Sequence, residues 1–109
     1  MTNTKQKESD LVRAICDYLS LRGYFFWRNN NTPIFDPVGK KFRAMPKYAM
    51  RGLSDIIVIL NGGVVVFFEV KTSKGIISEH QKAFQDKCKL IGAKYYIIRS
   101  IDELQILGV

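Results

Sequence analysis

Two acidic residues and a lysine stand at the ends of two neighbouring apolar segments of this sequence. Asp55 lies at the start of segment 54–60, and Glu69 lies near the end of segment 64–71. Both segments are rich in β-branched residues, which favour strands, and the Asn61-Gly62-Gly63 between them is typical of a hairpin turn. The sequence therefore predicts a hairpin with charged residues at its open end.

The register of this hairpin brings the charged residues together. A three-residue turn pairs Leu60 with Val64, and the same alternation places Asp55 opposite Glu69. Cross-strand neighbours have Cβ atoms about 4.5–5.5 Å apart, where two carboxylates repel each other unless a cation lies between them. Lys71 follows Glu69 by two residues, so it projects from the same face.

Oxygen ligands at this separation suit a hard divalent cation such as Mg²⁺ or Mn²⁺. A lysine beside such a cation can position or help deprotonate a water, or stabilise the charge that develops on a phosphate. The alternative is a set of solvated strand ends joined by a salt bridge, which is the commoner explanation of any single Glu-x-Lys. The common face of all three residues favours the metal site.

A helix is predicted over 4–22 because apolar residues recur there at helical spacing, and Gly23 ends it. Its apolar stripe comprises Leu11, Val12, Ile15, Tyr18 and Leu19. Glu8 shares this stripe, and an acid at the edge of a core needs a partner. It is either a third metal-ligating carboxylate or an acid that the helix dipole favours in the first turn.

A second helix is predicted over 78–91, opened by Ser78 and stopped by Gly92. Its apolar face comprises Phe84, Cys88 and Ile91. Gln81 has the spacing of a capping box with Ser78, and it also lies on the apolar face, which directs it toward the sheet. We favour the cap, and a helix that starts beside an active site can serve both purposes.

Two further strands, over 24–28 and 94–99, and a short terminal helix over 101–107 complete the predicted elements. The order is helix, three strands, helix and strand. This is an α/β fold, a small mixed β-sheet flanked by helices, with the second helix as a crossover. The aromatic residues Phe25, Phe26 and Trp27 of the first strand are expected in the core rather than as a base-stacking platform.

Length and charge restrict the class of protein. The 109 residues correspond to one domain, 1–109, and 17 basic against 10 acidic residues give a net charge of +7. Such a basic domain favours nucleic acid as the partner. Cys16 and Cys88 are too far apart in sequence for a zinc site, which indicates a reduced, cytoplasmic protein. No segment has the length of a membrane span, and the polar N-terminus does not resemble a signal peptide.

The segment 29–51 is predicted to be irregular, and from residue 38 onward it carries basic residues and no acid. It leads into the strand of Asp55, so it can hold phosphates beside the cation. Its alternative is a solvated loop, and residues 29–31, all asparagine, are either DNA contacts or ordinary turn residues. The candidate nucleic-acid-binding residues are Arg28, Lys40, Lys41, Arg43, Lys47, Arg51 and Lys74.

The ordered set of motifs resembles a known family. Glu8, Gly52-Leu53-Ser54-Asp55, Glu69-Val70-Lys71 and Gln81 together resemble the VRR-Nuc branch of the PD-(D/E)xK nuclease superfamily. The resemblance runs from about Glu8 to Ser100, which is nearly the whole chain. Ser54 stands where the superfamily motif has proline, and the VRR-Nuc branch usually lacks that proline.

The resemblance implies a restriction-endonuclease-like αβββαβ core and metal-dependent hydrolysis of phosphodiester bonds in DNA. It implies that Asp55 and Glu69 are the central metal ligands, joined by the backbone carbonyl of Val70. Glu8 would complete the metal site. The resemblance further implies that Lys71 is the catalytic lysine, with Gln81 near the site.

Stand-alone members of this family are small phage or bacterial proteins that are similar to four-way (Holliday) junction resolvases and act as homodimers. We therefore expect a Mg²⁺- or Mn²⁺-dependent, structure-specific DNA endonuclease, a dimeric junction resolvase acting on branched DNA without a small-molecule cofactor or a membrane. The alternatives are a non-catalytic basic DNA-binding module and a nuclease subunit that needs a partner protein.

Overall fold

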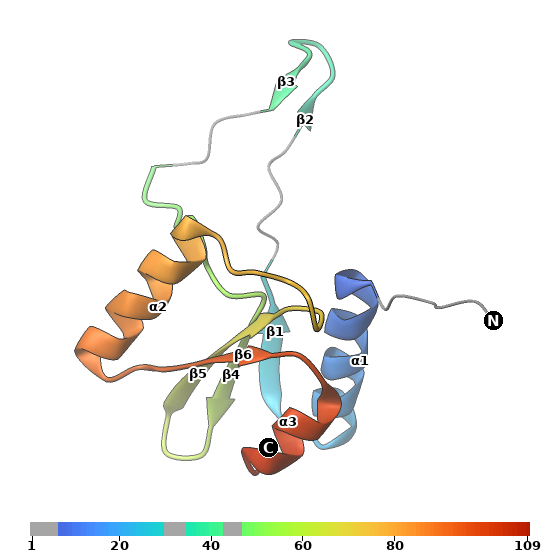
Figure 1. The fold of residues 1–109 in the computed structure, drawn as a ribbon, viewed down its shortest axis with the longest axis vertical. Coiled ribbons are helices and arrows are strands. Elements are labelled where there is room, and N and C mark those ends of the chain that lie inside the picture. Colours follow the sequence, from blue (N-terminus) through green and yellow to red (C-terminus); the bar gives the residue numbers. More distant parts are fainter. Residues whose placement is uncertain (1–6, 30–34, 43–46) are drawn as a thin grey trace, which may run out of the picture.

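A mixed four-stranded sheet with helices on both faces forms the body of the molecule (Figure 1). The computed structural model describes residues 7–29, 35–42 and 47–109. The elements are α1 (Glu8–Leu21), β1 (Phe25–Arg28), β2 (Phe35–Asp36), β3 (Lys41–Phe42), β4 (Ile56–Leu60), β5 (Val64–Val70), α2 (Glu79–Ile91), β6 (Lys94–Ile98) and α3 (Ile101–Ile106).

The strand order in the sheet is β1-β4-β5-β6. The β1–β4 and β4–β5 pairs are antiparallel, whereas β5 and β6 are parallel and are joined by α2 as the crossover. Leu60 pairs with Val64, which confirms the three-residue turn and its register. The predicted α/β class, the αβββαβ order and the mixed sheet are therefore confirmed. The predicted start of the first helix, at residues 4–6, lies outside the described residues.

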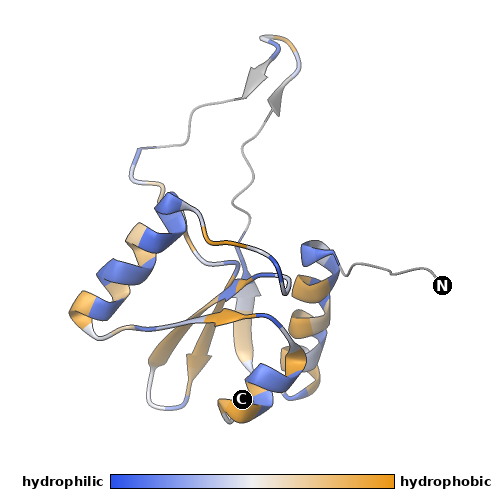
Figure 2. Ribbon diagram, in the orientation of Figure 1, coloured by the Kyte–Doolittle hydropathy of each residue, from blue (hydrophilic) through white to orange (hydrophobic). Residues whose placement is uncertain are grey.

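The main core lies between the sheet and helices α1 and α3, where orange, hydrophobic positions meet in Figure 2. Four residues of the predicted stripe on α1 are buried there, namely Leu11, Val12, Ile15 and Leu19. Phe68 of β5 is fully buried among them. The Tyr18 hydroxyl, from the same stripe, donates to the backbone carbonyl of Val109 at 2.8 Å, which ties the C-terminus to α1.

Helix α2 covers only part of the opposite face. Phe84 stacks edge-on against Phe67 with ring centroids 5.1 Å apart, and it also contacts Tyr95 of β6. Cys88 is buried as predicted, whereas the side chain of Ile91 is 80% exposed. The prediction for Ile91 was wrong because α2 packs along the edge strand β6, and no other described element buries the last turn of α2.

The predicted burial of the first strand was also wrong for two of its aromatic residues. Phe25 is 67% exposed and Trp27 is 42% exposed, while Phe26 packs partly buried against the core. The register places Phe25 and Trp27 on the face that α2 covers, beside Ile57 and Ile59 of β4. Because β1 is the edge strand farthest from α2, no described element covers this end of that face.

The segment predicted as irregular contains a short hairpin instead. Strands β2 and β3 pair as antiparallel partners, and they lie well away from the sheet (Figure 1). Lys40 ends the tight turn between them with a positive φ of 52°. Residues 30–34 and 43–46, on either side of this hairpin, lie outside the described residues. Within the described ranges, no helix is long and apolar enough to cross a membrane.

The fold predicts a sharp contrast between two phenylalanines. Replacing the fully buried Phe68 by alanine is expected to lower the free energy of unfolding by about 3–5 kcal/mol. The same change at the exposed Phe25 is expected to cost less than about 1 kcal/mol. Urea denaturation followed by circular dichroism measures both. Equal losses in the two variants would contradict this assignment of the core.

Candidate active site

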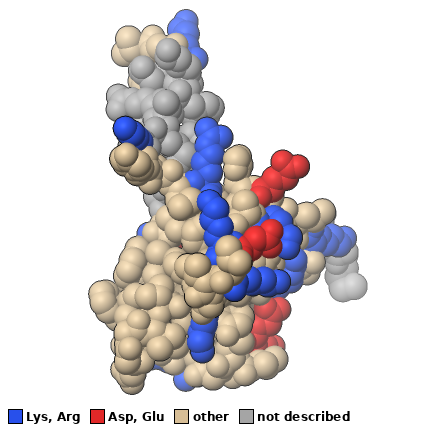
Figure 3. Space-filling view, turned by 90° about the vertical axis from the view of Figure 1, so that its left-hand side faces the viewer, with Lys and Arg blue, Asp and Glu red and all other residues tan. Residues whose placement is uncertain are grey.

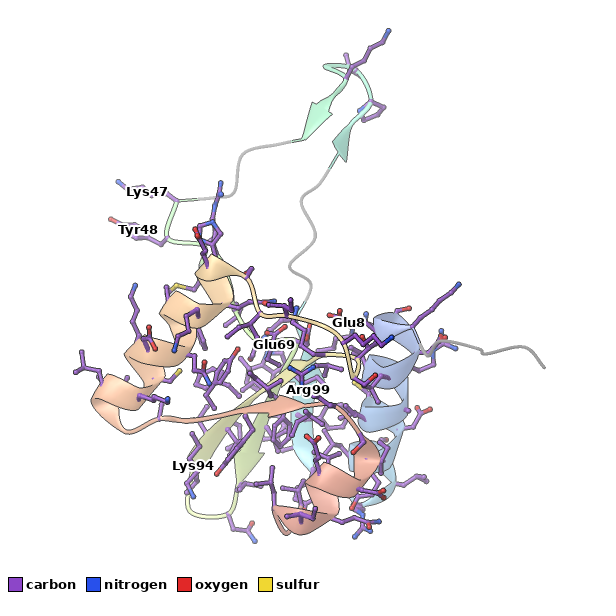
Figure 4. The ribbon with its side chains drawn as sticks, viewed as in Figure 1. Glu8, Lys47, Tyr48, Glu69, Lys94 and Arg99 are labelled. Carbon is purple, nitrogen blue, oxygen red and sulfur yellow. The ribbon has the colours of Figure 1, made fainter. Side chains whose placement is uncertain are left out.

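Three carboxylates from separate parts of the chain converge at one end of the sheet. Glu8 is the first residue of α1, Asp55 directly precedes β4, and Glu69 lies near the end of β5. One oxygen atom from each carboxylate lies within 4.8 Å of the others. Figure 4 shows Glu8 and Glu69 at this end, with Lys94 at the opposite end of the sheet. The predicted convergence of the acids is therefore observed.

Asp55 is held by the neighbouring strand. Its carboxylate accepts a hydrogen bond of 2.8 Å from the backbone N–H of Val70. The strand β4 begins at Ile56, two residues later than the predicted segment 54–60, so Asp55 stands just outside the regular β4–β5 ladder. The Asp55 side chain thus holds the N–H of the last residue of β5, while its backbone carbonyl accepts from the N–H of Asn29 on the side of β1.

Glu69 is buried, with 1% of its surface exposed. Burial, and then the negative charge of Asp55, raise the pKa of its carboxyl to about 9, against the attraction of the Lys71 ammonium. The Lys71 Nζ lies 4.0 Å from Glu69 Oε1. The other oxygen, Oε2, is buried without a hydrogen-bond partner among the described residues. Glu69 is therefore a buried acid, close to two other acids, with one oxygen that no described residue binds. Such a group is stabilised by a further positive charge, such as a bound cation.

Gln81 serves both of the functions considered for it. Its Oε1 accepts from the backbone N–H of Ser78 at 2.8 Å, and the Ser78 hydroxyl accepts from the backbone N–H of Gln81, which completes the capping box. Its Nε2 donates to Glu69 Oε1 at 2.8 Å. The same amide therefore starts α2 and fixes the orientation of the buried acid.

Gly52 allows the segment before Asp55 to pack closely against the first turn of α2. Its φ is +75°, and a Cβ atom there would lie 2.2 Å from the backbone carbonyl oxygen of His80. Only glycine permits so close a passage of the chain across the first turn of α2. Through this contact the segment that leads to Asp55 and the helix that carries Gln81 are packed together.

Arg99 is a residue of this region that the sequence analysis did not single out. One guanidinium nitrogen donates to the carbonyls of Thr72 and Gly75, at 2.6 and 2.9 Å. Gly75 in turn packs against the side chain of Lys71, where an added Cβ would lie 3.2 Å from its Cδ. Arg99 thus fixes the turn that follows β5. Nothing in the local pattern marks it, because an arginine at a strand end is commonly solvated.

The predicted nucleic-acid-binding residues fall into two groups. The exposed ones are Arg28, Lys40, Lys47, Arg51 and Lys74. Arg43 lies outside the described residues, and Lys41 is described only as part of β3. Lys47 lies over the ring of Tyr48, 5.2 Å from its centroid, and Figure 4 shows the two beside the N-terminal end of α2. In Figure 3, lysine and arginine side chains gather on one side of the molecule, next to a broad uncharged surface.

The arrangement also matches a known fold. A solved structure titled "VRR_NUC domain" superposes with a TM-score of 0.64 at 20% sequence identity, covering 92% of this chain and 91% of that chain. The chain has the VRR_NUC fold. No protein-family model matches the sequence, and no curated protein matches it.

The donor set at this end of the VRR_NUC fold suits a hard divalent cation. All three side chains offer oxygen atoms, which Mg²⁺ and Mn²⁺ prefer. Glu69 Oε2, which no described residue hydrogen-bonds, supplies an acceptor for such a cation. Lys71 and Gln81 both approach the other oxygen, so the carboxylate is oriented before any cation binds. The residues present therefore fit a divalent metal site.

The raised pKa of Glu69 predicts how stability changes with pH in the metal-free protein. The folded chain keeps the Glu69 proton up to about pH 9, whereas the unfolded chain loses it near the ordinary pKa of 4.5. Between these values the folded state binds more protons, so the free energy of unfolding falls with rising pH, by at most about 1.4 kcal/mol per pH unit.

Urea denaturation of the metal-free chain at about pH 5 and about pH 8 measures this loss. The E69Q variant has no proton to lose, so its stability is expected to change less between the two pH values. A wild-type slope equal to that of E69Q would contradict the prediction.

The contact at Gly52 predicts a second effect. The G52A variant is expected to displace the first turn of α2. Its free energy of unfolding should fall by more than the about 1–3 kcal/mol that a strained φ alone costs, because a positive φ and a backbone clash coincide there. The G62A variant is the matched control. Gly62 also has a positive φ, of +82°, but nothing lies within 4 Å of an added Cβ. Thermal unfolding of both variants checks the difference, and equal losses would show that the contact with α2 is unimportant.

Proposed function

We propose that this chain is a VRR-Nuc-type nuclease that hydrolyses phosphodiester bonds in DNA with Mg²⁺ or Mn²⁺. The observation that carries the proposal is the buried Glu69 carboxylate, which meets Asp55 and Glu8 on one side and Lys71 and Gln81 on the other. A purely structural salt bridge needs neither three converging acids nor a buried oxygen without a partner. The similarity to the VRR_NUC fold supports the same assignment.

The proposed roles follow from position. Asp55, Glu69 and Glu8 would hold the cation with their carboxylates, together with the backbone carbonyl of Val70. A divalent cation bound there supplies Lewis acidity, which favours ionisation of a water and offsets the charge of the phosphate.

The remaining roles belong to residues that face Glu69. Lys71 would place its ammonium against the phosphate, where it stabilises the charge that develops during attack. Gln81 would keep the carboxylate of Glu69 in the orientation that binding requires, because its amide is already fixed by the helix cap. These roles need no further cofactor.

DNA is the substrate that the charge of the molecule favours. The net charge of +7 provides attraction to a polyanion. Lys40, Lys47 and Arg51 are exposed in the segment that leads to Asp55. Arg28 is exposed at the end of β1, whose next residue pairs with Asp55. We propose that these basic residues bind phosphates of the DNA.

The finer proposal is a homodimer that resolves four-way junctions. Two symmetric nicks require two active sites, which a twofold dimer provides. Exposed apolar side chains on β1, at Phe25 and Trp27, support association because an exposed apolar edge strand invites a partner. We propose branched DNA as the substrate and the cytoplasm as the compartment.

Cleavage of labelled DNA tests the proposal. The substrates are a four-way junction, a flap, linear duplex and single strand, each with Mg²⁺ or Mn²⁺. Cleavage is expected to fall at least about 100-fold in both the E69A and K71A variants, because E69A loses a proposed ligand of the cation and K71A loses the ammonium proposed to act on the phosphate. The K94A variant is the matched control, since Lys94 lies at the opposite end of the sheet, and it should cleave like the wild type.

The outcomes separate the alternatives. Paired nicks in the junction alone, with a dimer by light scattering, would support the resolvase. Cleavage of flaps or duplex instead would keep the nuclease and reject the resolvase. Metal-independent binding without any cleavage would contradict the nuclease and favour the DNA-binding module, unless a partner protein restores cleavage.

A further inference from the structure

Asn29 is linked to the backbone of Asp55 across the sheet. It follows the last residue of β1, and the pairing of Arg28 with Ile56 places it opposite Asp55. Its backbone N–H donates to the carbonyl of Asp55 at 2.8 Å. The β1–β4 pairing therefore continues one step beyond the regular strands, to the residue whose carboxylate belongs to the acidic cluster.

The side chain of Asn29 makes a second link to the same segment. Its Nδ2 donates to the backbone carbonyl of Ser54 at 2.9 Å. Its Oδ1 accepts from the indole Nε1 of Trp27 at 3.2 Å. Because the indole is only a donor, it fixes which end of the amide is oxygen and directs the NH₂ group toward Ser54.

This segment needs such a support because it is not part of a regular strand. Asp55 stands outside the β4–β5 ladder, and its carboxylate is turned toward the N–H of Val70. Ser54 is fully buried, and its hydroxyl donates to the carbonyl of Ile56 at 3.1 Å. The φ of Ser54 is not fixed by its side chain, whereas a proline at this position, as in the superfamily motif, would fix it. Asn29 donates one hydrogen bond to the carbonyl of Ser54 and one to the carbonyl of Asp55. These two bonds restrict the backbone that directs the Asp55 carboxylate.

We infer that Asn29 is a positioning residue for Asp55, and that Trp27 orients it. The inference rests on the proposed function, because it assigns Asn29 to the support of the proposed metal ligand. Asn29 touches no reacting atom and acts only through the backbone of residues 54 and 55. Groups that orient metal ligands typically change metal affinity by about 10–100-fold when they are removed.

The first measurement is Mn²⁺ binding to the metal-free full-length chain by isothermal titration calorimetry. The N29A variant is expected to bind Mn²⁺ about tenfold more weakly than the wild type. The W27F variant keeps the ring and loses the indole N–H, so it is expected to bind about two- to tenfold more weakly. The N61A variant is the matched control, since Asn61 is exposed in the turn between β4 and β5, and its affinity should equal that of the wild type.

A second measurement separates positioning from general damage to the fold. In N29A, cleavage is expected to fall at low Mn²⁺ and to recover as Mn²⁺ is raised, with the KM for DNA unchanged. A general loss of folded protein would not be restored in this way. Thermal unfolding of each variant checks that the protein is folded at the temperature at which Mn²⁺ affinity and cleavage are measured. If N29A does not fold, W27F decides the question, because it removes one hydrogen-bond donor and leaves Asn29 in place.

The outcomes distinguish the inference from the proposed function. Wild-type protein that binds no Mn²⁺ would overturn both. Wild-type binding together with N29A and W27F affinities within twofold of it would overturn the inference alone. Weakened Mn²⁺ binding in N29A and W27F, with N61A unchanged, would support it.

Discussion

The crowding of three carboxylates at one end of the sheet is the constraint on which the surrounding structure depends. Glu69 is the centre of this constraint because it is buried and near Asp55, so burial and charge both oppose its ionisation. Such a group lowers the stability of a folded chain unless it is neutralised or paired. The neighbouring elements supply several partial compensations: an ammonium from Lys71, an amide from Gln81 and a backbone N–H from Val70 for Asp55.

Two helices contribute their first turns to this end of the sheet. Glu8 opens α1, and Gln81 lies in the first turn of α2. The N-terminus of a helix carries partial positive charge, so both helices present their favourable ends to the acids. The close passage of Gly52 over α2 and the clamp of Arg99 on the turn after β5 keep these parts in contact. The positioning of the acids is thus shared between elements that are distant in sequence.

The sequence predicts the parts of the site that depend on period and register. The hairpin turn of three residues determines that Asp55 and Glu69 approach each other, and the spacing of Ser78 and Gln81 determines the cap. Exposure is harder to predict, because Phe25, Trp27 and Ile91 carry the same apolar pattern as core residues. Their exposure depends on how far α2 extends across the sheet, which is a tertiary property. The roles of Asn29 and Arg99 were not predicted for a similar reason, since their hydrogen bonds join backbone groups far away in the sequence.

The exposed aromatic edge and the acidic cluster are connected through short contacts. The ring of Trp27 lies 5.9 Å from that of Phe25 on the uncovered face, and its indole N–H binds Asn29, which in turn binds the backbone beside Asp55. A partner that covered this face would restrict Trp27, and the restriction would reach Asp55 through two hydrogen bonds. A segment that is ordered before its ligand binds loses less conformational entropy on binding. If the proposed dimer forms at this edge, we therefore expect the proposed site to bind Mn²⁺ more tightly in the dimer than in the monomer, which titrations at protein concentrations below and above dimerisation would measure.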